Sequence, residues 1–156
     1  MPRHSVTFTA VATGSSVGTY KTLLGVIFGN TTGYRGRVRK LSVQPDGEAA
    51  QDVNVSLRLS KTNNATTGTA TAVTPKKLDA NSIATNATAG KNYSAEPTTV
   101  DSQHFWEGAV NGRGGILVEW LPHEGPLWGI NETLILQASP GAASAVKLSG
   151  TIEWDE

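Results

Sequence analysis

The sequence predicts an all-β protein: an antiparallel two-sheet sandwich, jelly-roll-like, with eight or nine strands and one long excursion. Stretches of alternating or continuously apolar residues recur along the chain, and Gly, Pro or Asn separates them. The composition, with many threonines and 17 glycines in 156 residues, favours strands and turns over helices. No segment has a convincing helical period. A chain of this length suits one sandwich, so we expect a single domain over residues 1–156.

Four strands are expected in the first 60 residues, at 5–12, 20–28, 37–43 and 53–59. The second is almost continuously apolar, which is typical of a strand buried on both faces. A turn at Pro45-Asp46-Gly47 follows the third, because Pro fixes φ and Gly permits a positive φ. The fourth strand has the clearest alternation of apolar and polar residues in the chain.

Between residues 61 and 100 the apolar pattern weakens, and Thr, Ala and Asn dominate. We interpret this segment as a long extended loop or arm with one or two short strands, of which 68–74 is the strongest candidate. Long loops inside compact domains are usually functional or disordered. A polar segment has little to bury alone, so we expect this arm to be mobile until it orders against neighbouring subunits.

Regular alternation resumes with four expected strands at 104–110, 115–121, 133–138 and 146–154. Segments rich in Gly and Pro separate them. We expect the last strand to pair centrally within a sheet. Strands of unequal spacing with one long excursion favour a jelly roll. An immunoglobulin-like sandwich is the alternative, although the chain has no cysteine.

The net charge is zero, but the charges are unevenly distributed. Residues 1–78 carry ten Lys or Arg against three acids, and residues 79–156 carry three against ten. One interpretation is that neighbouring strands pair the opposite charges within the molecule. The other is a basic and an acidic face that pack against copies of the chain or a charged lattice. The second interpretation predicts a homo-oligomer, a dimer or trimer.

The segment 34–40, YRGRVRK, is the densest charge feature. On a strand, Arg35, Arg37 and Arg39 would project from one face, beside Lys40. Guanidinium groups suit carboxylates and phosphates. The near-neutral pI and a single adjacent aromatic residue, Tyr34, argue against nucleic acid. We therefore expect these residues to contact acidic groups of protein, and we expect no direct nucleic-acid binding.

No catalytic, cofactor or metal site is predicted. The chain has no cysteine and no phosphate-binding glycine loop. Its histidines, His4, His104 and His123, are far apart, so a zinc site built from them with Glu is a minor alternative. Glu107 and Glu119 lie on adjacent expected strands and are the pair that a glycosidase would use. Scattered surface acids are commoner than catalytic pairs, so we expect a non-enzymatic protein.

All four tryptophans fall in the last third of the chain. Trp120 and Trp154 stand among apolar residues, which favours packing in the core. Trp128 lies between Gly and Pro residues, and we expect it to be exposed and to contact another protein. The alternative is a carbohydrate-binding β-sandwich, in which Trp128 and Trp106 would stack on sugar rings.

The start of the chain lacks a signal peptide, and no apolar run is long enough to span a membrane, so we expect synthesis in a reducing cytoplasm. Four segments, YRGRVRKLSVQPDG, LRLSKTNNATTGTATAVTPKKLDANSIATNATAGKNYSAEPT, GRGGILVEWLP and TIEWDE, resemble small virion structural proteins of tailed bacteriophages. The resemblance covers roughly residues 34–156. It implies a capsid decoration or cement protein that binds the major capsid protein on the outside of the head and also associates with itself. A tail, neck or fibre-head component is the other virion role that it implies.

Overall fold

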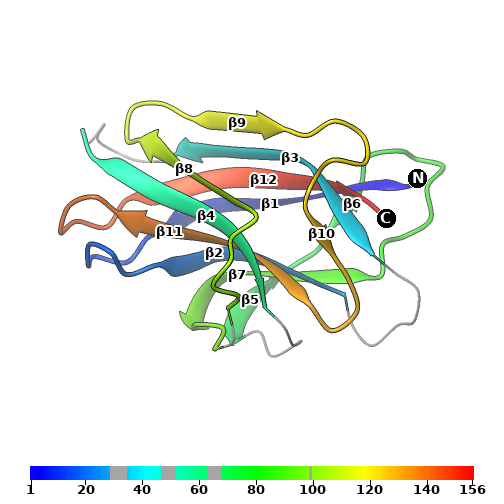
Figure 1. The fold of residues 1–156 in the computed structure, drawn as a ribbon, viewed down its shortest axis with the longest axis horizontal. Helices are drawn as coiled ribbons and strands as arrows, with labels where there is room; N and C mark the ends of the chain where they lie inside the picture. Colours follow the sequence, from blue (N-terminus) through cyan, green and yellow to red (C-terminus); the bar gives the residue numbers. More distant parts are fainter. Residues whose placement is uncertain (29–34, 47–51, 63–67, 99) are drawn as a thin grey trace.

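A computed structural model describes residues 1–28, 35–46, 52–62, 68–98 and 100–156. In these ranges the regular elements are all strands, arranged as two facing sheets (Figure 1), so the predicted all-β sandwich is confirmed. The strands are β1 (Arg3–Ala12), β2 (Lys21–Phe28), β3 (Gly36–Pro45), β4 (Asn54–Thr62), β5 (Thr69–Val73), β6 (Lys76–Lys77), β7 (Ala87–Ala95), β8 (Trp106–Asn111), β9 (Ile116–Glu119), β10 (Leu127–Trp128), β11 (Thr133–Pro140) and β12 (Lys147–Asp155). None of the described residues forms a helix that is long and apolar enough to cross a membrane.

The strand order is that of a jelly roll. The first sheet has the order β10-β3-β12-β1-β6, with β9 also paired to β3, and the second has the order β5-β7-β2-β11-β4-β8. Four antiparallel pairs are nested: β1 with β12, β2 with β11, β3 with β9 and β4 with β8. This nesting folds the first half of the chain onto the second. As expected, β12 lies centrally, between β1 and β3.

The core fills the space between the sheets with the inward-facing residues of each strand. In β4 the alternation holds as predicted, and Val55, Leu57 and Leu59 are buried. In β3 it changes phase at a β-bulge, because Lys40 pairs with Glu153 while Val38 pairs with Trp154, which leaves Arg39 as the extra residue. Val38 and Leu41 are therefore both buried, and this explains the mixed sequence pattern of the segment.

The segment 61–100 differs from the expected irregular arm. Its residues 63–67 and 99 lie outside the described ranges, but the rest includes β5, close to the predicted 68–74, together with β6 and β7. The nine-residue β7 pairs with β2, β5 pairs with β7, and β6 pairs with β1, so the segment extends both sheets. The sequence pattern did not predict β7, because two of its buried residues, Ala87 and Ala89, are small and give a weak apolar signal.

The carboxylate of Glu156 connects the 78–87 segment to β1. It accepts hydrogen bonds from the Thr85 hydroxyl (2.6 Å) and the Asn86 backbone N–H (3.1 Å), and it lies 3.4 Å from Nε2 of His4. His4 is fully buried, and its ring packs on Trp154 with 5.8 Å between ring centroids. Burial lowers the pKa of His4 from its ordinary value of 6.5, with a smaller contribution from Lys77, and Glu156 opposes this shift in part.

This burial predicts a pH dependence of stability. As the pH falls through 6.5, the unfolded chain binds a proton at His4 that the folded chain resists, so the free energy of unfolding should decrease. Urea unfolding from pH 8 to pH 5 measures the slope for the wild type and for His4→Gln, which cannot be protonated. We expect a shallower slope in the variant. Equal slopes would show that His4 is not responsible.

Candidate interaction surface

The predicted row of basic residues, which comprises Arg35, Arg37, Arg39 and Lys40, lies at the start of β3. We call it the basic row, and its residues have different surroundings. Arg35 stands one residue before β3, and Tyr34 lies outside the described residues. The guanidinium of Arg37 donates to the backbone oxygens of His123 (2.5 Å) and Gly125 (3.3 Å). Arg37 therefore holds the loop between β9 and β10 against the edge of β3.

Arg39 and Lys40 form ion pairs within the molecule. Nε of Arg39 lies 3.3 Å from the carboxylate of Asp155 on β12, and Nζ of Lys40 lies 3.6 Å from that of Glu119 on β9. The Arg39 side chain is largely buried, at 13% exposure. The bulge at Arg39 and these separate partners mean that the three arginines do not form the single exposed row that we expected from strand periodicity.

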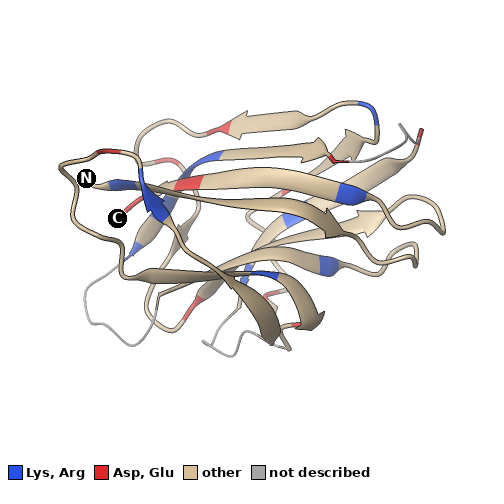
Figure 2. Ribbon diagram, turned by 180° about the vertical axis from the view of Figure 1, so that it is seen from behind, with Lys and Arg blue, Asp and Glu red and all other residues tan. Residues whose placement is uncertain are grey.

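The uneven charge distribution is explained by the nested pairing. Because the first half of the chain pairs with the second, opposite charges meet on neighbouring strands, and Figure 2 shows basic and acidic segments together near the termini. Among the described residues, four ion pairs join residues of 1–78 to residues of 79–156: Arg3–Asp155, Arg39–Asp155, Lys40–Glu119 and Lys61–Glu132. The first of our two interpretations therefore accounts for the charge pattern.

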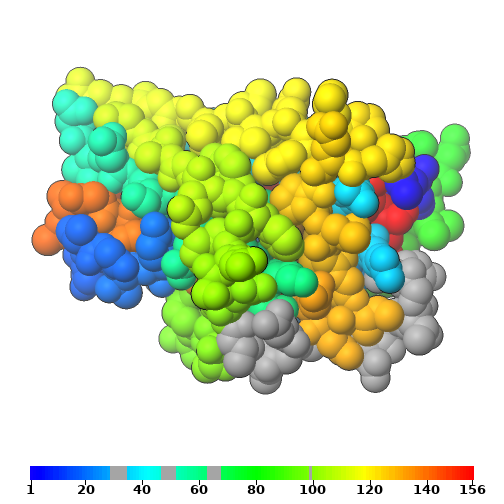
Figure 3. Space-filling view, in the orientation of Figure 1, coloured from blue at the N-terminus to red at the C-terminus, as the bar shows by residue number. Residues whose placement is uncertain are grey.

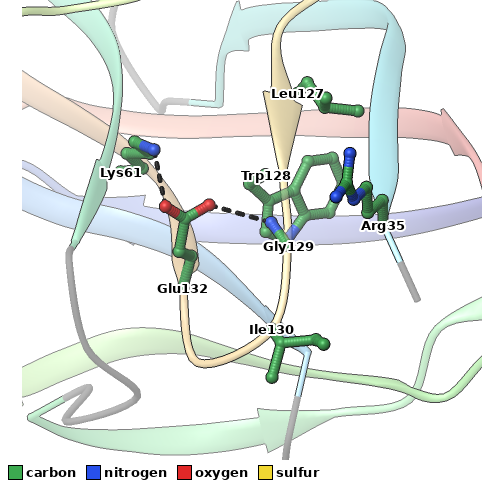
Figure 4. Close-up of a pocket in the computed structure, with 7 residues that line it drawn as sticks. All are labelled: Arg35, Lys61, Leu127, Trp128, Gly129, Ile130 and Glu132. Carbon is green, nitrogen blue, oxygen red and sulfur yellow. Dashed lines mark hydrogen bonds and ion pairs between the residues drawn. The ribbon is translucent and has the colours of Figure 1, made fainter. Parts of the chain in front are cut away.

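Arg35 lines an open pocket of about 350 Å³ (Figure 4). Leu127, Trp128 and Ile130 supply its apolar wall, and Lys61 and Glu132 stand on the opposite side. Arg35 itself is exposed and makes no hydrogen bond or ion pair with a described residue. The pocket thus combines an apolar wall with an unpaired guanidinium.

Glu132 organises the other side of this pocket. Its carboxylate accepts from Nζ of Lys61 (2.5 Å) and from the backbone N–H of Gly129 (2.9 Å), which fixes the turn between β10 and β11. We did not single out Lys61 or Glu132 from the sequence. The sequence indicates this ion pair only when the strand order is known, because β4 and β11 are neighbouring strands and the two charged residues lie at their adjoining ends.

Trp128 is not exposed, contrary to the prediction. Its side chain is 1% exposed and packs against Phe28 and Trp154, with ring centroids 5.3 and 6.1 Å away. The flanking Gly and Pro residues suggested a surface loop. However, Leu127–Trp128 pairs as β10 with the start of β3, which carries the indole into the sandwich. Trp128 nevertheless contributes to the lining of the pocket.

The carboxylates suggested for glycoside hydrolysis do not form a pair. Glu107 lies on β8, in the second sheet, whereas Glu119 lies on β9, in the first, because the β8–β9 connection crosses between the sheets. Their strands follow each other along the chain but are not neighbours in a sheet. No group of three His, Asp or Glu residues in the described ranges is placed to hold a metal ion.

One arrangement resembles a catalytic triad in its residue types. The Ser60 hydroxyl lies 2.6 Å from Nδ1 of His104, and Nε2 of His104 lies 3.4 Å from the carboxylate of Glu107. Ser60 is fully buried on β4, so a substrate has no access to its oxygen. The Ser60–His104 contact and the hydrogen bond from the Phe105 N–H to the Leu59 carbonyl oxygen hold residues 100–105 along β4. In Figure 3 this segment covers the strand.

No protein-family model and no curated protein matches this chain. Among solved structures, a chain from the structure of Cocksfoot mottle virus aligns over 96% of this chain and 91% of its own length, at 7% identity and a TM-score of 0.28. A chain from the structure of infectious bursal disease virus, Gt strain, aligns over 97% of this chain, which spans 40% of its length, at 15% identity and a TM-score of 0.19. Both TM-scores are low, so the jelly-roll assignment rests on the strand pairing described above.

Proposed function

We propose that this protein is a non-enzymatic structural component of a virion: a decoration or cement protein that docks on the outside of a phage head. Its partners are the major capsid protein and further copies of itself. The sequence segments that resemble small virion proteins of tailed phages support this role, and the jelly-roll strand order is compatible with it.

The observation that carries the proposal is a contrast among the basic residues of the 35–40 segment. Arg37, Arg39 and Lys40 are occupied by partners within the molecule. Arg35 remains unpaired among the described residues, above a pocket with an apolar wall. A guanidinium beside apolar side chains suits a carboxylate on the surface of a protein partner.

The chemistry of the remaining candidate residues also supports a structural role. The Ser60–His104–Glu107 arrangement is closed to substrate, and Glu107 and Glu119 are on different sheets. The carbohydrate-binding alternative relied on Trp128 and Trp106, but the Trp128 ring is in the core and Trp106 is partly buried against the core. Docking through Arg35 needs neither a nucleophile nor an aromatic platform.

Arg35→Gln tests the proposal, because it removes the unpaired charge without disturbing an internal contact. We expect wild-type protein to bind purified expanded heads saturably and Arg35→Gln to bind about fivefold more weakly or worse, with the largest loss at low salt. The matched control is Arg113→Gln, an exposed arginine in the β8–β9 turn, which should bind as the wild type does.

Circular dichroism should show the same fold in all three proteins. Duplex DNA and a polysaccharide serve as competing ligands. Saturable binding to polysaccharide alone, or to isolated tails alone, would contradict head decoration. Equal head binding by Arg35→Gln and the wild type would remove Arg35 as the docking residue.

A further inference from the structure

The edge strands of the two sheets differ in how well they are protected against pairing with another chain. An exposed strand edge presents unpaired backbone N–H and C=O groups, and natural proteins block it with charges, proline or very short strands. Among the described residues, β6 and β10 have two residues each, β9 has four and carries Glu119, and β8 carries Glu107. These edges are all protected in one of the known ways.

β5 lacks this protection. Its five residues, Thr69–Val73, have the sequence TATAV, with no charge and no proline. β5 pairs with β7 on one side only, and no described strand pairs with its other side, at the lower margin of the molecule in Figure 1. Residues 69–72 are all exposed. The register shift at this corner comes from extra residues in β7, where Asn92 has a φ of 52°, so β5 remains an unbroken run.

We propose that β5 is a self-association edge, at which it pairs antiparallel with β5 of a second copy about a two-fold axis at Thr71. The second sheets of two molecules would then form one continuous sheet. This inference deepens the self-association in the proposed function and rests on it.

The chemistry of the strand specifies a second copy as the partner. Antiparallel pairing about Thr71 places Thr69 opposite Val73, Ala70 opposite Ala72 and Thr71 opposite its own counterpart. Pairs of β-branched residues are favourable across strands, and no like charges meet. A two-fold interface requires a surface that complements itself, and a neutral antiparallel edge does so. A charged partner would find no opposite charge on this edge.

The test is self-association of the free protein, measured by sedimentation velocity over a range of concentrations. We expect the wild type to dimerise reversibly, and Thr71→Lys and Thr71→Glu each to weaken the dimer at least tenfold, because like charges would face each other at the axis. An equimolar mixture of the two variants should restore dimers, because an ammonium then faces a carboxylate. The control Thr88→Lys, exposed on the interior strand β7, should dimerise as the wild type does.

A wild type that stays monomeric at all concentrations would overturn the inference, as would dimerisation by Thr71→Lys that equals the wild type. Failure of the mixture to form heterodimers would exclude the two-fold at Thr71. These outcomes are independent of head docking, which Arg35→Gln tests separately. If the free protein is monomeric but binds heads through Arg35, only the β5 inference fails.

Discussion

Trp128→Ala is expected to lower the free energy of unfolding by about 3–5 kcal/mol, the usual loss when a large aromatic side chain is removed from a core. Trp128 is 1% exposed and touches rings from two other strands, Phe28 on β2 and Trp154 on β12. Its removal would open a cavity between the two sheets. Domains are typically stable by only about 5–15 kcal/mol, so this loss is a large share of the total.

Urea unfolding followed by circular dichroism measures this loss, and Trp128→Phe is the matched control. The indole Nε1 is buried and makes no hydrogen bond with a described residue, so phenylalanine forfeits little polar interaction. We expect it to retain most of the stability. An exposed docking residue would behave differently, because Trp128→Ala would then weaken head binding while the free energy of unfolding stayed unchanged.

The fold could be predicted from the sequence because large apolar residues mark the strands that face the core. Val55, Leu57 and Leu59 repeat at every second position, and this period identifies β4 without knowledge of its neighbours. The same signal fails where small residues are buried, as in β7, and where a bulge changes the phase, as at Arg39 in β3. The excursion and the basic row were therefore the weakest parts of the prediction.

The candidate site was less predictable than the fold because it depends on contacts between distant segments. Arg37 is occupied by carbonyl groups of His123 and Gly125, and a local pattern of charges cannot show this. The burial of Trp128 likewise follows from the pairing of β10 with β3, which brings together residues about ninety positions apart. Once the nested strand order is assumed, pairs such as Lys61–Glu132 do become predictable.

The outer face of the second sheet has a close contact of its own, between Gly25 on β2 and Tyr93 on β7. Leu134 and Leu136 belong to the central core, so Ile135, which pairs with Gly25, faces outward, yet it is fully buried. Tyr93 is 3% exposed, and burial raises the pKa of its phenol to about 12. Its hydroxyl makes no hydrogen bond with a described residue.

Gly25→Ala is expected to lower the free energy of unfolding by about 1–3 kcal/mol, the typical cost of overpacking a filled site. A Cβ at residue 25 would lie 2.1 Å from the Tyr93 hydroxyl oxygen and 3.1 Å from its Cζ, so the ring would have to move. Tyr93→Phe alone should be neutral or slightly stabilising, because it removes a buried hydroxyl that has no partner.

The double variant decides whether this contact causes the loss. With the hydroxyl absent, the nearest ring atom to the new Cβ is Cζ at 3.1 Å, which a small shift of the ring can accommodate. Gly25→Ala should therefore cost clearly less in the Tyr93→Phe background than in the wild type, when both are measured by urea unfolding. If the effects of the two substitutions on the free energy of unfolding are additive, the loss in Gly25→Ala comes from the backbone of β2 and not from a contact with the Tyr93 hydroxyl.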